Sequence, residues 1–405
     1  MTELGGASPE IHLPSGFSFS SAAAGIKASG RPDLALVECC AGTTAAAVFT
    51  RNRVVAAPVV IGREALKTSR GKIRAVLVNS GNANCATGPH GLRACRAVCR
   101  ETARVLGTRT DEVFPSSTGI IGVPLPTEKI LAQVPDLVAQ RQGMPEAAQR
   151  FAQAIMTTDT RPKVASAVLR IRNHEVRLLG VAKGSGMIHP QLATMLVYLF
   201  TDAVATAGEL KQLLTPVCDE TFNCISVDGD TSTNDTVLLL ASGKSNVALK
   251  DRHAARLFRP ALLEICQSLA EQIVRDGEGV QHVIRLSIEG ARNRDQALQI
   301  ARTIAHSPLV KTAWAGADPN WGRILAAVGR SGVPVDPEHI SIFIGRQRVC
   351  YRGQAFVFDE KAAHHHLSQP TSDVRVQLGR GGTGLSFLTT DLSSEYVRIN
   401  AEYST

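Results

Sequence analysis

The residue with the most distinctive chemical setting is Thr194, which lies near the middle of the chain in the stretch Lys183–Leu196. Gly184, Gly186 and Pro190 allow the backbone to reach Thr194 through a tight turn. A neighbouring hydroxyl can then attack the carbonyl of the small residue Ala193 and convert the peptide bond into an ester. Hydrolysis of that ester leaves a free α-amine, with a pKa of roughly 7.7–8.0, which can act as the general base for the threonine hydroxyl.

A plainer interpretation of the same residues is a turn that leads into a helix capped by Thr194. Two other segments have a similar double meaning. Thr118 offers a hydroxyl and Gly119 an accessible N–H, so this pair could stabilise an oxyanion or simply form a turn. Glu278 is flanked by glycines and could bind the ammonium group of an amino-acid substrate, or could be an exposed acid in a turn.

The motif around Thr194 resembles the self-cleavage site of the ornithine acetyltransferase (glutamate N-acetyltransferase) family. The matching residues are Lys-Gly-Ser-Gly-Met-Ile-His-Pro at 183–190 and Ala-Thr-Met-Leu at 193–196. Gln191 and Leu192 stand where the family commonly has Asn and Met, but they keep the polar and apolar character. Further ordered motifs extend the resemblance over almost the whole chain.

The resemblance implies a role for each of several residues. Cleavage between Ala193 and Thr194 would give an α chain of residues 1–193 and a β chain of residues 194–405. Thr118 and Gly119 match the family's oxyanion hole. The positions that match its substrate contacts are Thr158, Lys183, Thr194, Glu278, Asn400 and Thr405.

The reaction implied by the resemblance is acetyl transfer from N2-acetylornithine to glutamate, through an acetyl-threonine intermediate in a ping-pong cycle. It requires no metal or organic cofactor. The family associates as an α2β2 heterotetramer, and its members differ in whether acetyl-CoA also serves as a donor. The largest departure is Val280-Gln281-His282, where the family usually has Ala-Thr-Lys, and it bears on the preference for the amine acceptor.

Three alternatives keep part of this interpretation. The chain could be an aminopeptidase or amidohydrolase of the same fold, or an acetyltransferase of specialised metabolism with another acceptor. It could also be a non-catalytic binding protein, which would remain uncut, but the retained Ala193-Thr194 pair argues against that.

The composition is that of an ordinary globular protein. The chain has 405 residues, of which 44% are hydrophobic and 20% charged, and no apolar run is long enough to span a membrane. A net charge of +8 with scattered basic residues and 4% aromatics gives little reason to expect nucleic-acid binding. Nine cysteines without CxxC pairs and an N-terminus without a signal-peptide pattern predict reduced thiols in the cytoplasm.

Three patterns that suggest a ligand are better interpreted as loops or surface. His364, His365 and His366 are adjacent and cannot easily converge on one metal ion. The acidic segment 226–236 lacks the glycine and glutamate of a calcium loop. The GxGxxG match at 379–384 is followed by a strand-like stretch, so it is not a dinucleotide site.

The elements that must position these residues alternate between strands and helices. Expected strands cover 34–37, 54–61, 75–78, 164–171, 176–181, 237–241 and 283–290, and expected helices cover 90–106, 127–157 with a break near 143–145, 208–224 and 260–274. The 260–274 helix is predicted to begin at Pro260, and the plain interpretation of the last ten residues is a C-terminal strand. The fold class implied by the resemblance is a mixed α/β sandwich of the aminopeptidase-like, N-terminal-nucleophile kind.

Overall fold

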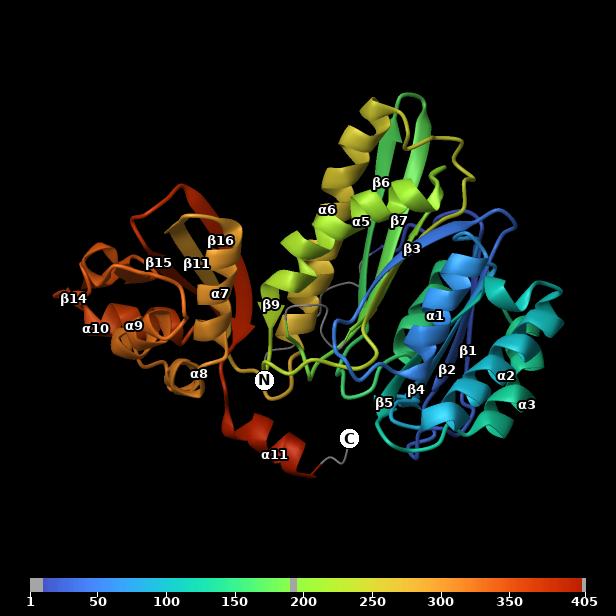
Figure 1. Cartoon of the computed structure of the whole chain (residues 1–405), viewed down its shortest axis with the longest axis horizontal. Coiled ribbons are helices and arrows are strands. Elements are labelled where there is room, and N and C mark those ends of the chain that lie inside the picture. Colours follow the sequence, from blue (N-terminus) through green and yellow to red (C-terminus); the bar gives the residue numbers. More distant parts are fainter. Residues whose placement is uncertain (1–9, 190–194, 403–405) are drawn as a thin grey trace.

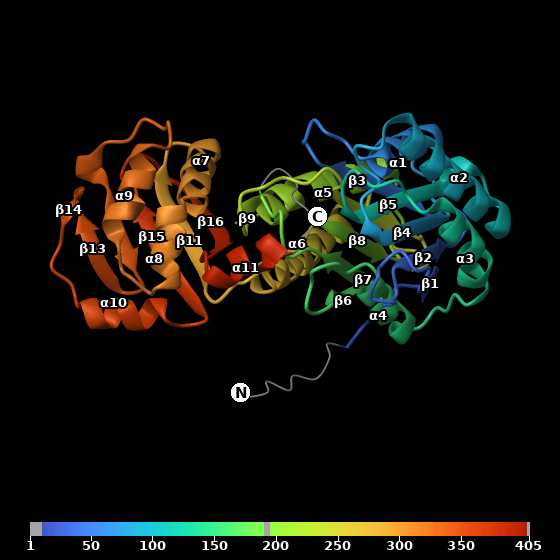
Figure 2. The same cartoon turned by 90° about the horizontal axis from the view of Figure 1, so that it is seen from below.

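A computed structural model of the chain describes residues 10–189 and 195–402. The first two-thirds form a sandwich in which two sheets pack face to face between two layers of helices (Figure 1). The remaining third forms a second α/β unit beside the sandwich (Figure 2). The mixed α/β class predicted from the sequence is confirmed.

The first sheet has the strand order β1-β2-β4-β5. Its strands are β1 (Phe17–Ala22), β2 (Leu34–Cys39), β4 (Ala75–Asn82) and β5 (Val113–Ile120). One face packs on helices because Leu34, Leu36 and Leu77 alternate along the strands and point to that side. The helices there are α1 (Ala57–Thr68), α2 (Gly88–Leu106) and α3 (Thr127–Ala139).

The second sheet has the order β3-β10-β8-β7-β6. Its strands are β3 (Thr44–Phe49), β6 (Lys163–Ile171), β7 (His174–Lys183), β8 (Leu196–Thr201) and β10 (Thr236–Ala241). Tyr198 and Phe200 of β8 face the first sheet, whereas Val197 and Leu199 face the outer helices. Those helices are α5 (Ala207–Glu220) and α6 (Arg252–Arg275), and α4 (Pro145–Ala154) closes the gap between the sheets.

The C-terminal unit is built on a seven-stranded sheet with the order β14-β13-β12-β15-β11-β16-β9. The short strand β9 (Ile225–Ser226) comes from the sandwich part of the chain and pairs with β16, which joins the two units. The other strands are β11 (Val283–Ala291), β12 (Ser341–Ile344), β13 (Gln347–Tyr351), β14 (Gln354–Ala355), β15 (Thr371–Gln377) and β16 (Thr383–Thr390). Its helices are α7 (Arg294–Ala305), α8 (Pro308–Ala315), α9 (Trp321–Gly329) and α10 (Glu360–Leu367).

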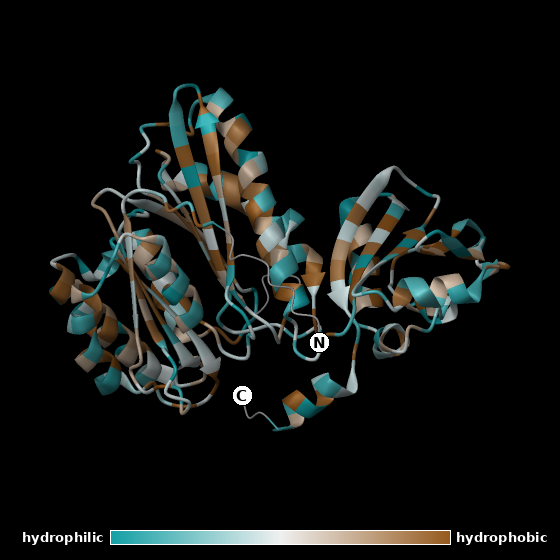
Figure 3. Cartoon of the chain, turned by 180° about the vertical axis from the view of Figure 1, so that it is seen from behind, coloured by the Kyte–Doolittle hydropathy of each residue, from teal (hydrophilic) through white to brown (hydrophobic). Residues whose placement is uncertain are grey.

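The last helix, α11 (Ser394–Glu402), leaves the C-terminal unit and returns toward the sandwich (Figure 1). Apolar residues lie mainly along the strands and on the inward stripes of helices such as α6, as the hydropathy colouring shows (Figure 3). Among the described residues, no helix is both long enough and apolar enough to cross a membrane. All nine cysteines are described and unpaired, as predicted.

Three expected elements are wrong in type or boundary. The apolar run 54–61 is not a strand, because helix α1 begins at Ala57 with Pro58 in its first turn, and the buried positions Ala57, Ile61 and Ala65 follow a helical spacing. Helix α6 begins at Arg252 rather than at Pro260, since the carboxylate of Asp251 caps the N–H groups of His253 and Ala254. The C-terminal tail contains helix α11 and not a strand.

Candidate active site

Residues that are distant in the sequence line one cavity of about 340 Å³ at the ends of β5 and β7. Every predicted site residue that the structure describes lies on its wall: Thr118, Gly119, Thr158, Lys183, Glu278 and Asn400. Ala193, Thr194 and Thr405 lie outside the described residues. The cavity therefore brings together side chains from the first sheet, the second sheet, the loop after α6 and α11.

The predicted oxyanion pair lies at the end of β5. Gly119 has a φ of 131° and faces Gly81 of β4, and a Cβ atom at Gly119 would come within 2.3 Å of the Gly81 carbonyl carbon. Only glycine fits there, because a side chain would collide with the neighbouring backbone. Thr118 is 4% exposed, and its Oγ1 accepts a hydrogen bond of 3.2 Å from Lys183 Nζ.

Amide side chains hold this edge of the sheet in place. Asn79 accepts a hydrogen bond of 2.6 Å from the Ser117 hydroxyl and donates one to the Asn82 carbonyl. Asn234 donates from its amide to the carbonyls of Ala83 and Ser117, at 2.7 and 2.8 Å. The side chains of Asn79 and Asn234 thus support the end of β5 directly beside Thr118. Nothing in the sequence apart from its position in a polar loop indicates that Asn234 supports the site.

Lys183 ends β7 and is buried between hydroxyl groups and a carboxylate. Its Nζ donates to Thr157 Oγ1 at 2.7 Å and lies 3.8 Å from Asp159. Burial lowers the pKa of Lys183, and the Asp159 carboxylate opposes that shift. The lysine is thus held in place on the cavity wall by its neighbours.

Asp159 is a supporting residue that follows Thr158 in the chain and was not predicted as part of the site. Its Oδ1 accepts hydrogen bonds from Lys163 Nζ at 2.7 Å and from the backbone N–H of Gly184 at 2.6 Å. Burial favours the neutral acid, but the ammonium groups of Lys183 and Lys163 outweigh it and keep the pKa of Asp159 well below its usual range. Lys163 is also paired with Asp276 at 2.6 Å, so a buried ionic network underlies the cavity floor.

Glu278 lies on the same cavity wall. Its Oε2 accepts a hydrogen bond of 3.0 Å from the amide of Asn400, which arrives on α11. A Cβ atom at Gly186 would lie 2.5 Å from the Glu278 carboxyl group, so glycine at this position leaves room for the carboxylate. Thr158 also lines the cavity, and its hydroxyl lies 2.7 Å from that of Ser185.

Further residues on the cavity wall were not predicted as site residues, among them Asp228, Asp230 and Tyr396. Asp228 accepts backbone hydrogen bonds from Met187 at 2.6 Å and from Ile188 at 2.9 Å. Burial raises the pKa of Asp228 to about 6, and the charges of Asp230 and Glu278 add to the rise. The acidic segment 226–236 is conspicuous in the sequence, but its pattern only excluded a calcium loop and did not indicate that Asp228 and Asp230 line the cavity.

The chain resumes after the gap at Met195, whose backbone N–H donates to Asp235 Oδ1 at 3.1 Å. Met195 is 1% exposed and leads directly into β8, the strand between β7 and β10. Burial also raises the pKa of Asp235 well above its usual range. A turn into a capped helix, the plain alternative for this stretch, is wrong because a strand follows.

The departure at Val280-Gln281-His282 does not line the cavity. The backbone N–H groups of Gln281 and His282 bind the Asp391 carboxylate, and the His282 ring lies 3.0 Å from the Gln369 carbonyl. Val280 packs against the core under α6. These residues tie the sandwich to the C-terminal unit.

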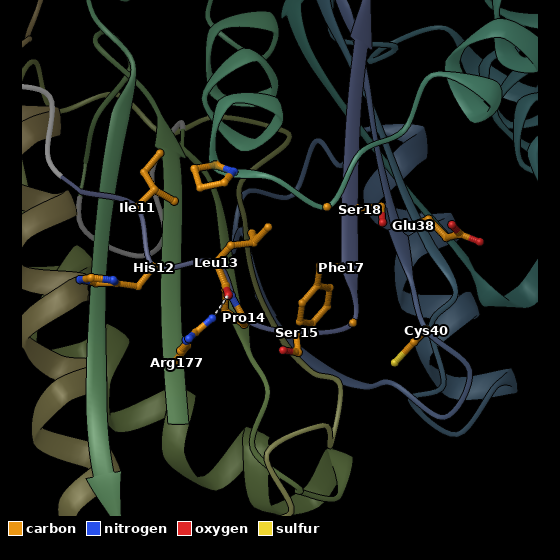
Figure 4. Close-up of a pocket in the computed structure, with 13 residues that line it drawn as sticks. Ile11, His12, Leu13, Pro14, Ser15, Phe17, Ser18, Glu38, Cys40 and Arg177 are labelled. Carbon is orange, nitrogen blue, oxygen red and sulfur yellow. Dashed lines mark hydrogen bonds between the residues drawn. The ribbon is translucent and has the colours of Figure 1, made fainter. Parts of the chain in front are cut away.

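A larger hollow of about 680 Å³ lies elsewhere, where the N-terminal segment crosses the sandwich (Figure 4). His12, Glu38 and Arg177 line it, and none of the predicted site residues does. Throughout residues 10–189 and 195–402, no three His, Cys, Asp or Glu side chains are grouped as metal ligands would be. His364 and His366, which lie on α10, instead contact the backbone carbonyls of Ala317 and Asp373.

Comparison with known proteins gives a consistent result. The ArgJ family model matches residues 18–405. The arginine biosynthesis bifunctional protein ArgJ of Methylococcus capsulatus is 47% identical, over 96% of this chain and 95% of its own. A crystal structure of the protein of that name from Bacillus halodurans is 41% identical and covers 51% of this chain and 98% of its own, with a TM-score of 0.49.

A crystal structure of ornithine acetyltransferase complexed with ornithine, from Mycobacterium tuberculosis, is also 41% identical. It covers 44% of this chain and 92% of its own, with a TM-score of 0.39. The family match spans nearly the whole sequence, and the relative from Methylococcus capsulatus agrees with it over almost its full length. The chain therefore belongs to the ArgJ family of acyltransferases, as its sequence motifs predict.

Proposed function

We propose that this chain transfers an acetyl group from N2-acetylornithine to glutamate and releases ornithine and N-acetylglutamate. The observation that carries the proposal is the cavity that brings Thr118, Lys183 and Glu278 together. Its wall offers hydroxyl groups, an ammonium group and carboxylates, so the cavity suits an amino acid that carries both charges. The name of the relative from Methylococcus capsulatus places that protein in arginine biosynthesis.

The proposal includes self-cleavage between Ala193 and Thr194, which gives an α chain of residues 1–193 and a β chain of residues 194–405. Thr194 would then carry both the nucleophile and its base. Its α-amine takes the proton from its own hydroxyl as Oγ attacks the acetyl carbonyl of the donor. The same amine returns the proton to the departing amine of ornithine, which leaves an acetyl ester on Thr194.

The oxyanion that forms in each half-reaction requires hydrogen-bond donors. In the proposal these are the Thr118 hydroxyl and the Gly119 N–H, and donors fixed in advance stabilise such a charge without reorganisation. The hydrogen bond from Lys183 Nζ to Thr118 Oγ1 leaves the hydroxyl proton of Thr118 free to point at the substrate. The α-amine of glutamate then attacks the ester, the Thr194 α-amine carries the proton from that amine to Oγ as the ester bond breaks, and N-acetylglutamate leaves.

The remaining assignments complete the proposal. Thr158, Lys183, Glu278 and Asn400 contact the substrate from the cavity wall. Thr405 adds a contact from the C-terminus. Buried thiols and the absence of disulfides among the nine cysteines support a cytoplasmic enzyme. The cleaved chains would assemble as an α2β2 heterotetramer, which native mass spectrometry would detect.

The experiment that tests the reaction incubates purified protein with N2-acetylornithine and glutamate and quantifies all four amino acids by mass spectrometry. Stoichiometric formation of ornithine and N-acetylglutamate supports the proposal. Release of acetate and ornithine without transfer would instead identify an amidohydrolase. Replacement of glutamate by other amines tests for a different acceptor.

A second donor is the additional activity that one observation favours, because the relative from Methylococcus capsulatus is named a bifunctional protein. Acetyl-CoA would acetylate Thr194 and pass the acetyl group to glutamate. Incubation of the enzyme with acetyl-CoA and glutamate, in the absence of acetylornithine, separates a bifunctional enzyme from one that only recycles the acetyl group.

A further inference from the structure

One polar segment, residues 226–236, holds the backbone on both sides of the proposed cleavage site. Before the site, the N–H of Val227 donates to the Ile188 carbonyl at 2.9 Å. The carboxylate of Asp228 accepts the N–H groups of Met187 and Ile188 at 2.6 and 2.9 Å. Met187 has a φ of 53°, a left-handed conformation that its side chain disfavours, so this turn depends on the hydrogen bonds that hold it.

After the site, the other end of the same segment holds Met195. Its N–H donates to Asp235 Oδ1 at 3.1 Å, and its carbonyl accepts the N–H of Thr236 at 3.1 Å. Ile188 and Met195 are therefore fixed by one neighbour. A short stretch of chain with fixed ends has few conformations, which favours a reaction between two of its own groups.

His189, the last described residue before the site, is held from the C-terminal unit. Its Nδ1 lies 3.1 Å from Nε2 of His306, which follows α7, and the two ring centroids are 4.5 Å apart. The same Nε2 lies 3.0 Å from the hydroxyl of Ser226 on β9. Burial lowers the pKa of His306 to about 3 and that of His189 to about 4, so both rings are uncharged at neutral pH.

The single hydroxyl proton of Ser226 decides the direction of these hydrogen bonds. That proton is donated to the Ile188 carbonyl at 3.0 Å, so Ser226 Oγ accepts from His306. Nε2 of His306 therefore carries the ring proton and presents it to Ser226 Oγ and to Nδ1 of His189. His306 does not line the cavity, so these contacts act on the chain before the cleavage site and not on the substrate.

We propose that His306 is a positioning residue for self-cleavage. Through Ser226 and His189 it holds the backbone that leads into the cleavage site in the arrangement that the reaction requires. The inference rests on the proposed self-cleavage. The acetyl transfer that follows does not depend on His306, because the substrate cavity is formed without it.

The reaction that His306 assists rearranges one peptide bond and then consumes one water molecule. A bond forms between Thr194 Oγ and the Ala193 carbonyl carbon, the peptide C–N bond breaks, and the hydroxyl proton passes to the nitrogen. Water then hydrolyses the ester to the Ala193 carboxylate and restores the hydroxyl of Thr194, which now has a free amine. No bond to His306 forms or breaks, and its ring keeps its proton throughout.

The test follows cleavage of the full chain by denaturing electrophoresis after a pulse of cell-free synthesis. His306→Leu fills the space of the ring but cannot donate to Ser226 or His189. We expect its cleavage rate to fall by about tenfold, the size associated with one lost hydrogen bond that leaves buried partners unpaired. His306→Gln can donate from nearly the position of Nε2 and should recover most of the rate. Once cut, both variants should match the kcat/KM of the wild type for acetyl transfer.

His364→Leu is the matched control, because it removes a histidine whose ring contacts the Ala317 carbonyl within the C-terminal unit. It should be cut at the rate of the wild type. Ser226→Ala removes the hydroxyl between the His306 ring and the Ile188 carbonyl, so it should also be cut slowly, and it provides the test if the leucine variant does not fold.

Three results would overturn the inference. They are cleavage of His306→Leu or Ser226→Ala at the wild-type rate, a glutamine variant as slow as the leucine variant, and slow cleavage accompanied by an equal loss of acetyl transfer in the cut form. A wild type that remains uncut would instead refute the proposed self-cleavage, so the two failures are distinguishable.

Discussion

At the scale of single residues, the site depends on a few small side chains that give larger groups room. Gly119 faces Gly81 across two strands, and Gly186 leaves space for the Glu278 carboxylate. The sequence marks these glycines as flexible, but only the fold shows which atoms a side chain would meet. Thr118, Lys183 and Glu278 could be named from the motif, whereas Asp159 could not, because its role comes from two lysines that burial brings to it.

Thr118→Val should reduce turnover strongly while the protein still folds and is cut. Valine has a similar shape but lacks the hydroxyl that would donate to the oxyanion, and loss of one such donor costs about 100–1000-fold in kcat. Steady-state kinetics with N-acetylornithine and glutamate measure the effect. Thr118→Ser is the control that restores a hydroxyl and should recover most of the turnover. Turnover near that of the wild type in Thr118→Val would remove Thr118 from the oxyanion hole.

Gly186→Ala should weaken substrate binding more than it slows chemistry. The new Cβ would lie 2.5 Å from the Glu278 carboxyl group and must displace it from its contact with Asn400. Loss of one hydrogen bond to a charged group predicts a rise in KM of about tenfold or more. Gly382→Ala is the control, since nothing lies within 4 Å of a Cβ atom there. Equal KM values for the two variants would contradict this account of Glu278.

At the scale of elements, the sequence predicted the helices and strands in which apolar residues recur at a regular spacing. The hairpin of β6 and β7 and the alternating strand β11 follow their patterns. The run 54–61 was misread because Val, Val and Ile favour strands, and burial against the first sheet overrides that preference in α1. Helix α11 has no buried side chain, so no apolar period could reveal it, although it carries Asn400 to the site.

Asp159, in the loop that joins α4 to β6, should make the free energy of unfolding fall in acid. Its native pKa is depressed, so its contribution is fully present above its unfolded pKa of about 3.9 and is lost as the pH falls toward the native value. Asp159→Asn should therefore be less stable than the wild type at neutral pH, and the difference should narrow below about pH 4. Urea unfolding at several pH values measures it. A difference that stays constant with pH would contradict the ionised, paired state of Asp159.

At the scale of the whole molecule, the second sheet interleaves the two parts that cleavage at Thr194 would create. Strands β8 and β10 follow Thr194 in the chain, and they lie between β3 on one side and β7 on the other. The sequence suggests the proposed cleavage site but not this arrangement, because strand order is set by long-range packing. Separation of the two chains would expose the centre of a sheet that is buried on both faces.

The cut protein should therefore behave as one particle. We expect both chains to elute together in size-exclusion chromatography, even after prolonged dilution, and to separate only in denaturant. The reason is that β8 bonds to β7 across six residue pairs and β10 bonds to β3 across six more. Elution of a free chain under native conditions would show that the two parts do not share this sheet.

The central claim is that Thr194 becomes a new N-terminus and acts as the nucleophile. Denaturing electrophoresis with intact-mass analysis of the wild type beside Thr194→Ala tests it most directly. We predict two chains of similar size for the wild type, the second beginning at Thr194, and one uncut chain for the variant. A wild type that remains one intact chain would contradict the claim, and the catalytic role of Thr194 would fall with it.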